Sequence, residues 1–276
     1  MKVYQTSDIR NIALVGGAKS GKTTLAEAML FNGGVINRRG TVDDKNTVSD
    51  YRDIEIDRKN SVSTSLLYTE FGGKKINILD VPGFADFQGE LVSAFNVVEA
   101  AVVTVNAQSG IEVGTELAYR YSNALKTPLI FDINQLDAEK ANFDECIAQL
   151  KDYFGGKCTV IQYPVNQGIG FNSIIDIVAN KMFTFKGGKV EASDIPADQA
   201  DKAAEMRSAL VEEAAAADDE LMEKYFEEGD LSAEDLSKAL RLAIDKLDIS
   251  PILCTHAQDD MGVARLLDLL VDHVHA

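Results

Sequence analysis

The sequence predicts an α/β fold built on a mostly parallel sheet of six strands with helices on its faces. Short apolar runs rich in Val, Ile and Leu alternate with amphipathic segments, a pattern typical of βα units joined by right-handed crossovers. A glycine-rich segment, residues 16–23, lies between the first strand-like run and the first helical run. Such loops occur in nucleotide-binding α/β sheets, so this segment supports the same fold class.

The apolar runs give the elements of this fold in order. Six strands are predicted, at residues 11–15, 63–71, 75–80, 100–106, 128–134 and 251–255. Five helices are predicted, at residues 22–31, 87–98, 114–124, 143–153 and 262–274. Gly72 and Gly73 indicate a hairpin, so the second strand is expected to be antiparallel to the third. Residues 32–62 are polar and without pattern, and loops of this length are usually functional or mobile.

Residues 157–250 interrupt the alternation. They begin with strand-like pieces at 158–165 and 174–185 and end with helices at 197–226 and 233–246. We therefore assign residues 1–156 and 251–276 to one domain and residues 157–250 to an α+β insertion. Residues 191–250 carry 18 acidic and 6 basic side chains, a charge that nucleic acid phosphate repels. This acidic surface is either a solvated helical face or a docking surface for a protein.

Bulk composition excludes several classes of protein. The net charge is −17, no apolar run is long enough to span a membrane, and the first residues lack the apolar core of a signal peptide. The cysteines, Cys146, Cys158 and Cys254, lack metal-binding spacing and are expected to be buried, reduced thiols. We expect a cytoplasmic protein with neither membrane nor sequence-specific DNA as a partner.

The glycine-rich segment matches the pattern GxxxxGK[ST], with a strand-like run before it and a helical run after it. Its glycines let backbone N–H groups turn toward phosphate oxygens, and the N-terminus of the next helix favours the same anion. Lys22 adds charge for the outer phosphates, and the Thr23 hydroxyl is a ligand for Mg²⁺. The expected phosphate site comprises Gly16, Gly17, Ala18, Lys19, Ser20, Gly21, Lys22, Thr23 and Thr24. A glycine-rich turn that matches by chance is the alternative.

A second motif, Asp80-Val81-Pro82-Gly83, closes the strand predicted at 75–80. A carboxylate at the end of a strand beside the phosphate loop can hold Mg²⁺ through water. Gly83 has no Cβ and can bring its N–H close to a terminal phosphate. We expect Lys22, Asp80 and Gly83 to act on the phosphates. A plain proline–glycine turn is the alternative.

A third motif, Asn134-Gln135-Leu136-Asp137, follows the strand predicted at 128–134. An Asn side chain can bond a purine edge, and the Asp137 carboxylate can accept both N–H groups of guanine, which adenine lacks. The backbone of Thr255, His256 and Ala257, after the last strand, is expected to reach the guanine carbonyl oxygen.

The order of these motifs resembles the translational GTPases, and the match is close to the G domain of elongation factor G. Residues 10–12, 21–24, 80–87 and 251–263 look like that family, as do 194–198 and 220–225 in the insertion. The resemblance implies a P-loop GTPase fold in which residues 32–62 are switch I, residues 80–88 are switch II and the insertion is the G′ subdomain.

The resemblance also implies ligands and partners. It implies GTP and GDP as ligands, Mg²⁺ as cofactor held by Thr23, Ser61 and Asp80, and a role as a ribosome-dependent switch in translocation. The insertion faces the ribosomal stalk protein in relatives. A monomer is expected, with further domains after Ala276 in the complete protein.

One departure from the family affects catalysis. Family members carry a His that orients the attacking water, and this chain has Phe84 there; a phenyl ring cannot bond water in that way. The histidines, His256, His273 and His275, all lie near the C-terminus. Loss of one preorganised polar group costs roughly 100- to 1000-fold in rate. We therefore expect weak hydrolysis, unless another group such as Gln88 replaces the His.

Three more departures affect binding. Lys19 stands where the family has an Asp that helps to hold a monovalent cation, and it is either a built-in cation or a solvated lysine. Gln135 replaces a Lys that stacks on guanine, which predicts weaker affinity with selectivity retained. Ser61 replaces the switch I Thr on Mg²⁺, with Ser63 and Thr64 as competing ligands.

Other functions stay open. A non-hydrolysing GTP-binding module of the ribosome is favoured by Phe84. A kinase or ATPase that shares only the phosphate loop is disfavoured by Asn134 and Asp137. Within the family, a release-type or ribosome-protection GTPase is a further alternative.

Overall fold

The central sheet has seven strands in the order β2-β3-β1-β4-β5-β11-β6. The structure is a computed structural model, and it describes residues 3–276. The strands are β1 (Ile9–Val15), β2 (Ser65–Phe71), β3 (Lys74–Asp80), β4 (Ala100–Asn106), β5 (Leu129–Asn134), β6 (Cys158–Val160) and β11 (Ser250–Cys254). Among the described strands of this sheet, only β2 is antiparallel, and it pairs with β3 through the hairpin at Gly72 and Gly73. The predicted α/β class and the hairpin are confirmed.

The seventh strand corrects the predicted count of six. β6 pairs in parallel with β11, with Ser250 opposite Cys158, so it extends the central sheet. The sequence placed these residues at the start of the insertion, because a three-residue apolar run carries no sign of its partner strand.

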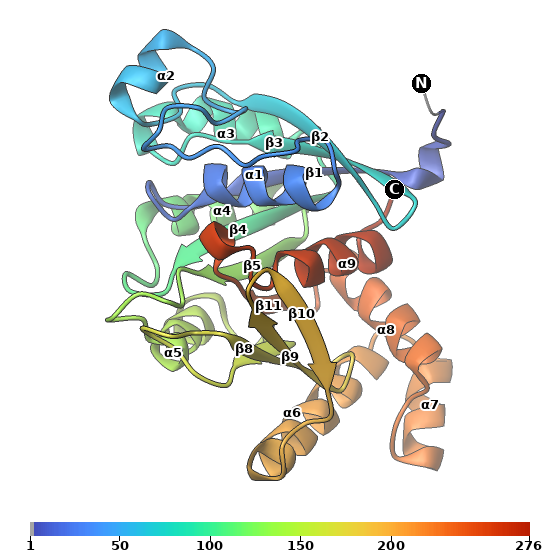
Figure 1. Cartoon of the computed structure of the whole chain (residues 1–276). Helices are drawn as coiled ribbons and strands as arrows, with labels where there is room; N and C mark the ends of the chain where they lie inside the picture. The colour runs from blue at the N-terminus through green and yellow to red at the C-terminus, as the bar shows by residue number, and fades with distance from the viewer. Residues whose placement is uncertain (1–2) are drawn as a thin grey trace.

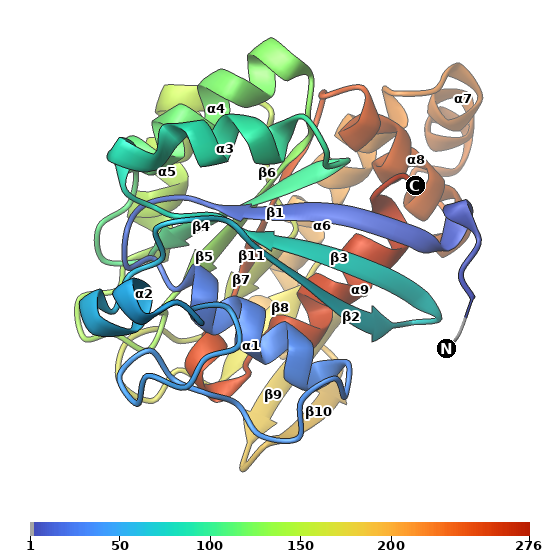
Figure 2. The same cartoon turned by 90° about the horizontal axis from the view of Figure 1, so that it is seen from above.

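Helices cover both faces of the sheet (Figures 1 and 2). One face carries α1 (Lys22–Asn32) and α9 (Val263–His273), and the other carries α3 (Gln88–Phe95), α4 (Val113–Leu125) and α5 (Phe143–Phe154). The inner strands are therefore buried on both sides, which explains their continuous apolar runs. β4, for example, is buried from Ala100 to Val105.

Residues 161–249 build a second layer of structure beside the central sheet (Figure 1). An antiparallel sheet joins β7 (Gln162–Pro164), β8 (Ser173–Asp176), β9 (Lys181–Lys186) and β10 (Lys189–Ser193), and the helices α6 (Ala197–Ala215), α7 (Asp219–Glu228) and α8 (Ala233–Asp245) follow.

The single helix predicted at 197–226 is in fact two. Asp218 accepts the N–H of Leu221 at 3.2 Å and starts α7 as its N-cap, although the helical pattern of the sequence continues across the break. The sequence also missed the short helix α2 (Asp53–Arg58), which lies within the segment that carried no pattern.

The parallel arrangement brings several loops to one edge of the sheet. The carboxyl ends of β1, β3, β4, β5 and β11 meet there, and ligands bind at this edge in open α/β sheets. The predicted phosphate, Asp80 and Asn134 motifs all follow these strand ends.

The expectation for the cysteines is also met within residues 3–276. Cys146, Cys158 and Cys254 are buried free thiols, and burial raises the pKa of Cys146 to about 11 and that of Cys158 to about 12. No helix in this range is long and apolar enough to cross a membrane.

Candidate nucleotide-binding site

A cavity of about 520 Å³ opens at the carboxyl edge of the sheet, within the usual size of small-molecule sites. Lys19, Lys22 and Thr23 line it from the phosphate loop and α1, and Asp50 and Ser61 line it from segment 32–62. The expected residues Ala18, Gly21, Thr24, Gly83, Phe84 and Gln135 also border the cavity.

The phosphate loop has the backbone that its glycines allow. Gly16 and Gly21 have φ angles of 128° and 98°, which side chains rarely adopt. A Cβ would lie 2.4 Å from the Thr104 carbonyl oxygen at Gly16 and 2.3 Å from Asn134 Nδ2 at Gly21. The loop therefore packs directly against the strands beneath it, which fixes the start of α1.

Lys22 lies beneath this loop, with only 6% of its surface exposed. Its ammonium group donates to the Gly17 carbonyl oxygen at 2.6 Å and to that of Gly16 at 3.3 Å. Burial lowers its pKa to about 8, against the opposing effects of Asp80 and Glu112. A Cβ at Gly83 would lie 2.5 Å from Lys22 Nζ and 2.7 Å from the Gly17 carbonyl oxygen, so the turn after β3 contacts the loop directly.

Five oxygen-bearing side chains form one cluster next to Lys22. Asp80 Oδ2 accepts from the Thr23 hydroxyl at 2.8 Å and from the Ser49 hydroxyl at 2.6 Å. The Ser61 hydroxyl lies 3.5 Å from Thr23 Oγ1 and donates to Asp50 Oδ1 at 2.7 Å. The phosphate loop, β3 and segment 32–62 thus meet at a single point.

The cluster fits a hard cation by its chemistry. Asp80 Oδ1 is buried and has no hydrogen-bond partner among residues 3–276. Burial raises the pKa of Asp80 to about 6, although its bonds from Ser49 and Thr23 oppose this. Burial also raises the pKa of Asp50. Within residues 3–276, no group of three His, Cys, Asp or Glu side chains could hold a metal. An ion here would depend on one or two carboxylates, on hydroxyls, on water and on phosphate oxygens, and proteins usually bind Mg²⁺ with few carboxylates, water and substrate phosphates.

Ser61 bonds to this cluster, whereas no bond to it is found within residues 3–276 for its competitors Ser63 and Thr64, which lie just after segment 32–62. The Ser63 hydroxyl accepts from the Arg52 guanidinium, and the Thr64 hydroxyl is buried without a partner. Ser49 and Asp50 also belong to the cluster, and the sequence did not predict them because no motif marks them.

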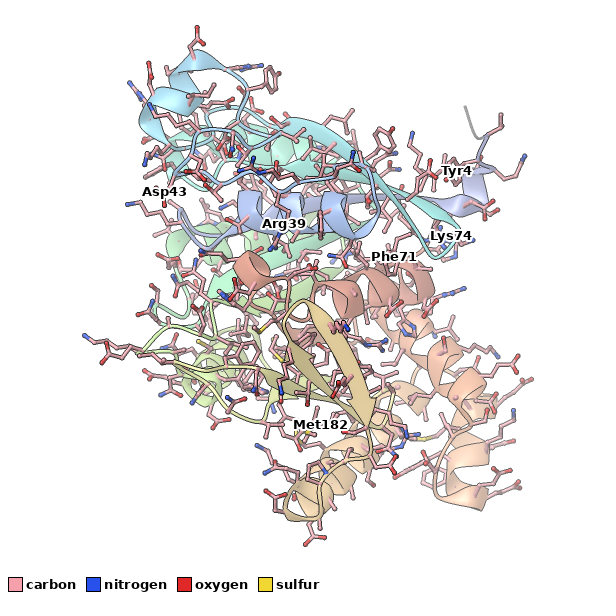
Figure 3. The ribbon with its side chains drawn as sticks, in the orientation of Figure 1. Tyr4, Arg39, Asp43, Phe71, Lys74 and Met182 are labelled. Carbon is pink, nitrogen blue, oxygen red and sulfur yellow. The ribbon has the colours of Figure 1, made fainter. Side chains whose placement is uncertain are left out.

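Segment 32–62 is anchored to the body of the domain on two sides. Glu27 of α1, 1% exposed, accepts from the backbone N–H groups of Gly40, at 2.8 Å, and of Val48. The Arg39 guanidinium donates to the Ala257 carbonyl oxygen at 3.0 Å, and Figure 3 shows Arg39 between α1 and the segment that leads into α9. Nothing in the sequence marks either anchor.

Asn134 joins the loops on the other side of the cavity. Its Nδ2 donates to the Ser20 carbonyl oxygen at 3.0 Å. Its Oδ1 accepts from the Ala257 N–H at 3.1 Å and lies 3.2 Å from the Thr255 hydroxyl. Three predicted motifs thus meet at one side chain, which is 2% exposed. Gln135, with a φ angle of 63°, donates to the Lys19 carbonyl oxygen at 3.0 Å.

The structure gives His256 a side-chain contact that the sequence did not indicate. Its Nδ1 lies 2.9 Å from Asp137 Oδ1, and its Nε2 lies 3.4 Å from Asp259 Oδ2. The His256 side chain is 6% exposed and that of Asp137 is 45% exposed. The Asp137 carboxylate therefore faces solvent, and the buried His256 ring contacts it from the protein side.

Phe84 lies at the border of the cavity and is 40% exposed. It also lines a narrow crevice with Gln88 and Gly114, whereas Gln88 does not line the main cavity. His256 is on the Asn134 side, and His273 is buried in α9.

The phosphate loop, the oxygen cluster and the Asn134 junction define a nucleotide-binding domain of the P-loop class. Residues 7–276 match the family described as the elongation factor Tu GTP binding domain. The chain belongs to this family, so it is a GTP-binding domain of the translational GTPase type, and the inference from its motifs is confirmed.

A solved structure agrees with this family assignment. The crystal structure of ttk003000868 from Thermus thermophilus is similar with a TM-score of 0.92 and 30% sequence identity. The match covers 98% of this chain and 41% of that chain. This chain therefore spans less than half the length of that protein.

Proposed function

We propose that this domain binds Mg-GTP and Mg-GDP and serves as the ribosome-dependent switch of an elongation-factor-G-like protein in translocation. The observation that carries the proposal is the contact of Ser61 with Thr23 beside Asp80. This contact supports the proposed role of segment 32–62 as switch I, a segment that a γ-phosphate and its metal ion order. A release-type or ribosome-protection factor is the alternative within the family.

Each group in the site has a proposed role. Lys22 and the backbone N–H groups of the loop hold the phosphates, and Gly83 approaches the terminal phosphate. Thr23, Ser61 and Asp80 hold Mg²⁺, which neutralises phosphate charge when it is bound. On the base side, Asn134 and Asp137 select guanine; Gln135, Thr255, His256 and Ala257 complete the pocket.

The proposed rate of GTP hydrolysis is low. Phe84 places a phenyl ring at the border of the cavity, and a phenyl ring has no polar atom to orient water. We propose a slow GTPase, with a non-hydrolysing switch as the alternative that Phe84 favours. The acidic helices α6 to α8 are the proposed docking surface for the ribosomal stalk protein, on a monomer in the cytoplasm.

Nucleotide titration tests the binding part. GDP is expected to bind about 100-fold more tightly than ADP, and Asp137→Ala is expected to remove most of that preference. Asp144→Ala, which changes an exposed carboxylate in the first turn of α5, is the matched control. Equal affinities for GDP and ADP would refute guanine selection. GTP turnover with and without ribosomes then separates the slow GTPase from the non-hydrolysing switch.

A further inference from the structure

Asp132 is a buried acid that none of the proposed roles uses. It lies in β5, two residues before Asn134, and is 0% exposed. Every residue of β5 is buried, and strands buried on both faces are normally apolar throughout. A carboxylate at this place is costly and calls for a function or a compensating partner.

The described partners of Asp132 do not compensate its charge. Its Oδ1 accepts from the Thr255 hydroxyl at 2.8 Å, and its Oδ2 is buried without a partner. Its register neighbours in the sheet, Thr104 of β4 and Leu253 of β11, carry no charge. Burial raises the pKa of Asp132 to about 7, and the Thr255 bond opposes this only in part.

Titratable groups on and beside the adjoining strands do not neutralise Asp132, whose pKa shift has burial and the Thr255 bond as its causes. These groups include Cys254 in β11, His256 after it, Asp137 after β5 and Lys22 below the phosphate loop. Burial, with a contribution from Asp132, raises the pKa of the Cys254 thiol, while His256 contacts Asp137 and Lys22 bonds the loop carbonyls. Asp132 therefore communicates with the site through Thr255.

The Thr255 hydroxyl has one proton to donate, and two acceptor oxygens lie within its reach. Its hydroxyl oxygen lies 2.8 Å from Asp132 Oδ1 and 3.2 Å from Asn134 Oδ1. A hydroxyl donates one hydrogen bond at a time. When Asp132 is ionised, the proton of Thr255 turns toward Asp132, and the Thr255 lone pairs face Asn134 Oδ1.

We propose that Asp132 is a proton-dependent positioning residue of the base-binding side of this site. Protonated Asp132 donates to Thr255 Oγ1, and Thr255 then donates to Asn134 Oδ1. Asn134 is held in this state by Thr255, by the Ala257 N–H and by its own bond to the Ser20 carbonyl oxygen. One proton of Nδ2 stays available to a purine edge.

This inference rests on the proposed role of Asn134 in binding guanine. A nucleotide that contacts Asn134 binds more tightly when Asp132 is protonated. By linkage, nucleotide binding then takes up a proton near neutral pH. If Asp132 only destabilised the fold, it would change the free energy of unfolding. It would change neither the pH dependence of nucleotide affinity nor the proton uptake on binding.

The first test compares the chain with its Asp132→Asn variant, which is permanently neutral and nearly isosteric. Between about pH 6 and pH 8.5, the GDP affinity of the unaltered chain is expected to fall about fivefold more than that of D132N. This is the size of effect expected from the loss of one hydrogen bond. Titration of the GDP phosphates is common to both proteins and cancels. Calorimetry in buffers of different ionisation enthalpy is expected to show proton uptake that D132N lacks. Identical pH profiles would overturn the proposal.

A second pair of variants does not depend on D132N folding well. Thr255→Ser keeps the hydroxyl and is expected to keep the pH profile of the unaltered chain. Thr255→Val keeps the shape, removes the hydroxyl and is expected to give the D132N profile. A Thr255→Val profile that matches the unaltered chain would contradict the relay.

Asn134→Ala separates this inference from the proposed function. If N134A binds GDP as tightly as the unaltered chain, the proposed guanine site is wrong and the relay falls with it. If N134A weakens GDP binding while D132N and T255V leave the pH profile unchanged, the guanine site stands and the relay alone is wrong.

Discussion

The Thr23 hydroxyl donates to Asp80 Oδ2 at 2.8 Å and so joins the first turn of α1 to the end of β3. The same carboxylate oxygen accepts from Ser49, which adds segment 32–62 to the junction. Its second oxygen, Oδ1, is buried without a partner. Asp80 is thus the point where the proposed phosphate, metal and switch elements meet.

Replacing Asp80 by Asn should uncouple Mg²⁺ from nucleotide binding. The variant keeps the shape of the side chain but loses the charge, and we expect Mg²⁺ to strengthen GDP binding about 10- to 100-fold less than in the unaltered chain. GDP titrations with and without Mg²⁺ measure this. Ser49→Ala removes a bond to Asp80 without removing charge, so its effect should be smaller. An unchanged Mg²⁺ response in D80N would show that Asp80 is not at the metal site.

The sequence predicts the parts of this site that come from contiguous motifs. Residues 16–23, Asp80 and Asn134 follow strand ends, and parallel strands bring their ends together, so their meeting could be inferred. Ser49, Asp50 and Glu27 could not be found in this way, because their roles depend on how a long segment without pattern folds back on α1. Such contacts are set by tertiary packing rather than by local propensity.

Asp132 shows an intermediate case. A charge within the apolar run Leu129–Ile133 is visible in the sequence and indicates something unusual. Its partner Thr255 is 123 residues away, and only the pairing of β5 with β11 brings the two together. The seventh strand was missed for the same reason, since the partner of β6 is the distant β11.

Restoring a His at position 84 should increase hydrolysis without changing binding. The imidazole can bond water where the phenyl ring cannot, so we expect Phe84→His to raise ribosome-stimulated GTP turnover about 100-fold. GDP affinity is expected to stay within about twofold, because the change affects a transition-state contact only. Phe84→Leu is the control for side-chain size. Fast turnover in the unaltered protein, or none in F84H, would contradict the role given to this position.

Lys19 should make nucleotide binding independent of potassium. Lys19 is exposed and lines the cavity, and its φ angle of 64° is one that Gly and Asp tolerate. Exchanging sodium for potassium is expected to leave the GTP affinity of the unaltered chain unchanged. Lys19→Gly should weaken it about fivefold by removing one charge-assisted contact, and Lys19→Asp should weaken it further unless potassium is present. Potassium dependence in the unaltered chain would count against a built-in cation.

Glu27 should control the order of segment 32–62. Its carboxylate accepts from Gly40 and Val48, so Glu27→Ala leaves two backbone N–H groups without partners. We expect trypsin to cleave after Arg38, Arg39 or Lys45 about tenfold faster in this variant, because local opening becomes easier. Glu27→Gln keeps one acceptor and should give an intermediate rate. Mass spectrometry of early digests locates the cuts, and equal rates in all three proteins would exclude the anchor.

Asp132→Asn should stabilise the fold at neutral and alkaline pH. Burial raises the pKa of Asp132 from 3.8 to about 7, so between these values the native state holds a proton that the unfolded chain has released. Stability therefore falls as pH rises through this window, and the loss is complete above it. The variant lacks this loss and should gain about 2–4 kcal/mol in free energy of unfolding near pH 8.

The gain should vanish below about pH 4, where Asp132 is protonated in both states. The raised pKa of Asp80 also lowers stability as pH rises. This loss of stability occurs in both the unaltered chain and D132N, so it cancels in the difference between them. Urea denaturation without nucleotide or metal at a series of pH values measures the difference. A D132N variant less stable than the unaltered chain near pH 8 would mean that the ionised carboxylate is compensated in the fold, and it would remove the energetic basis for proton binding at this site.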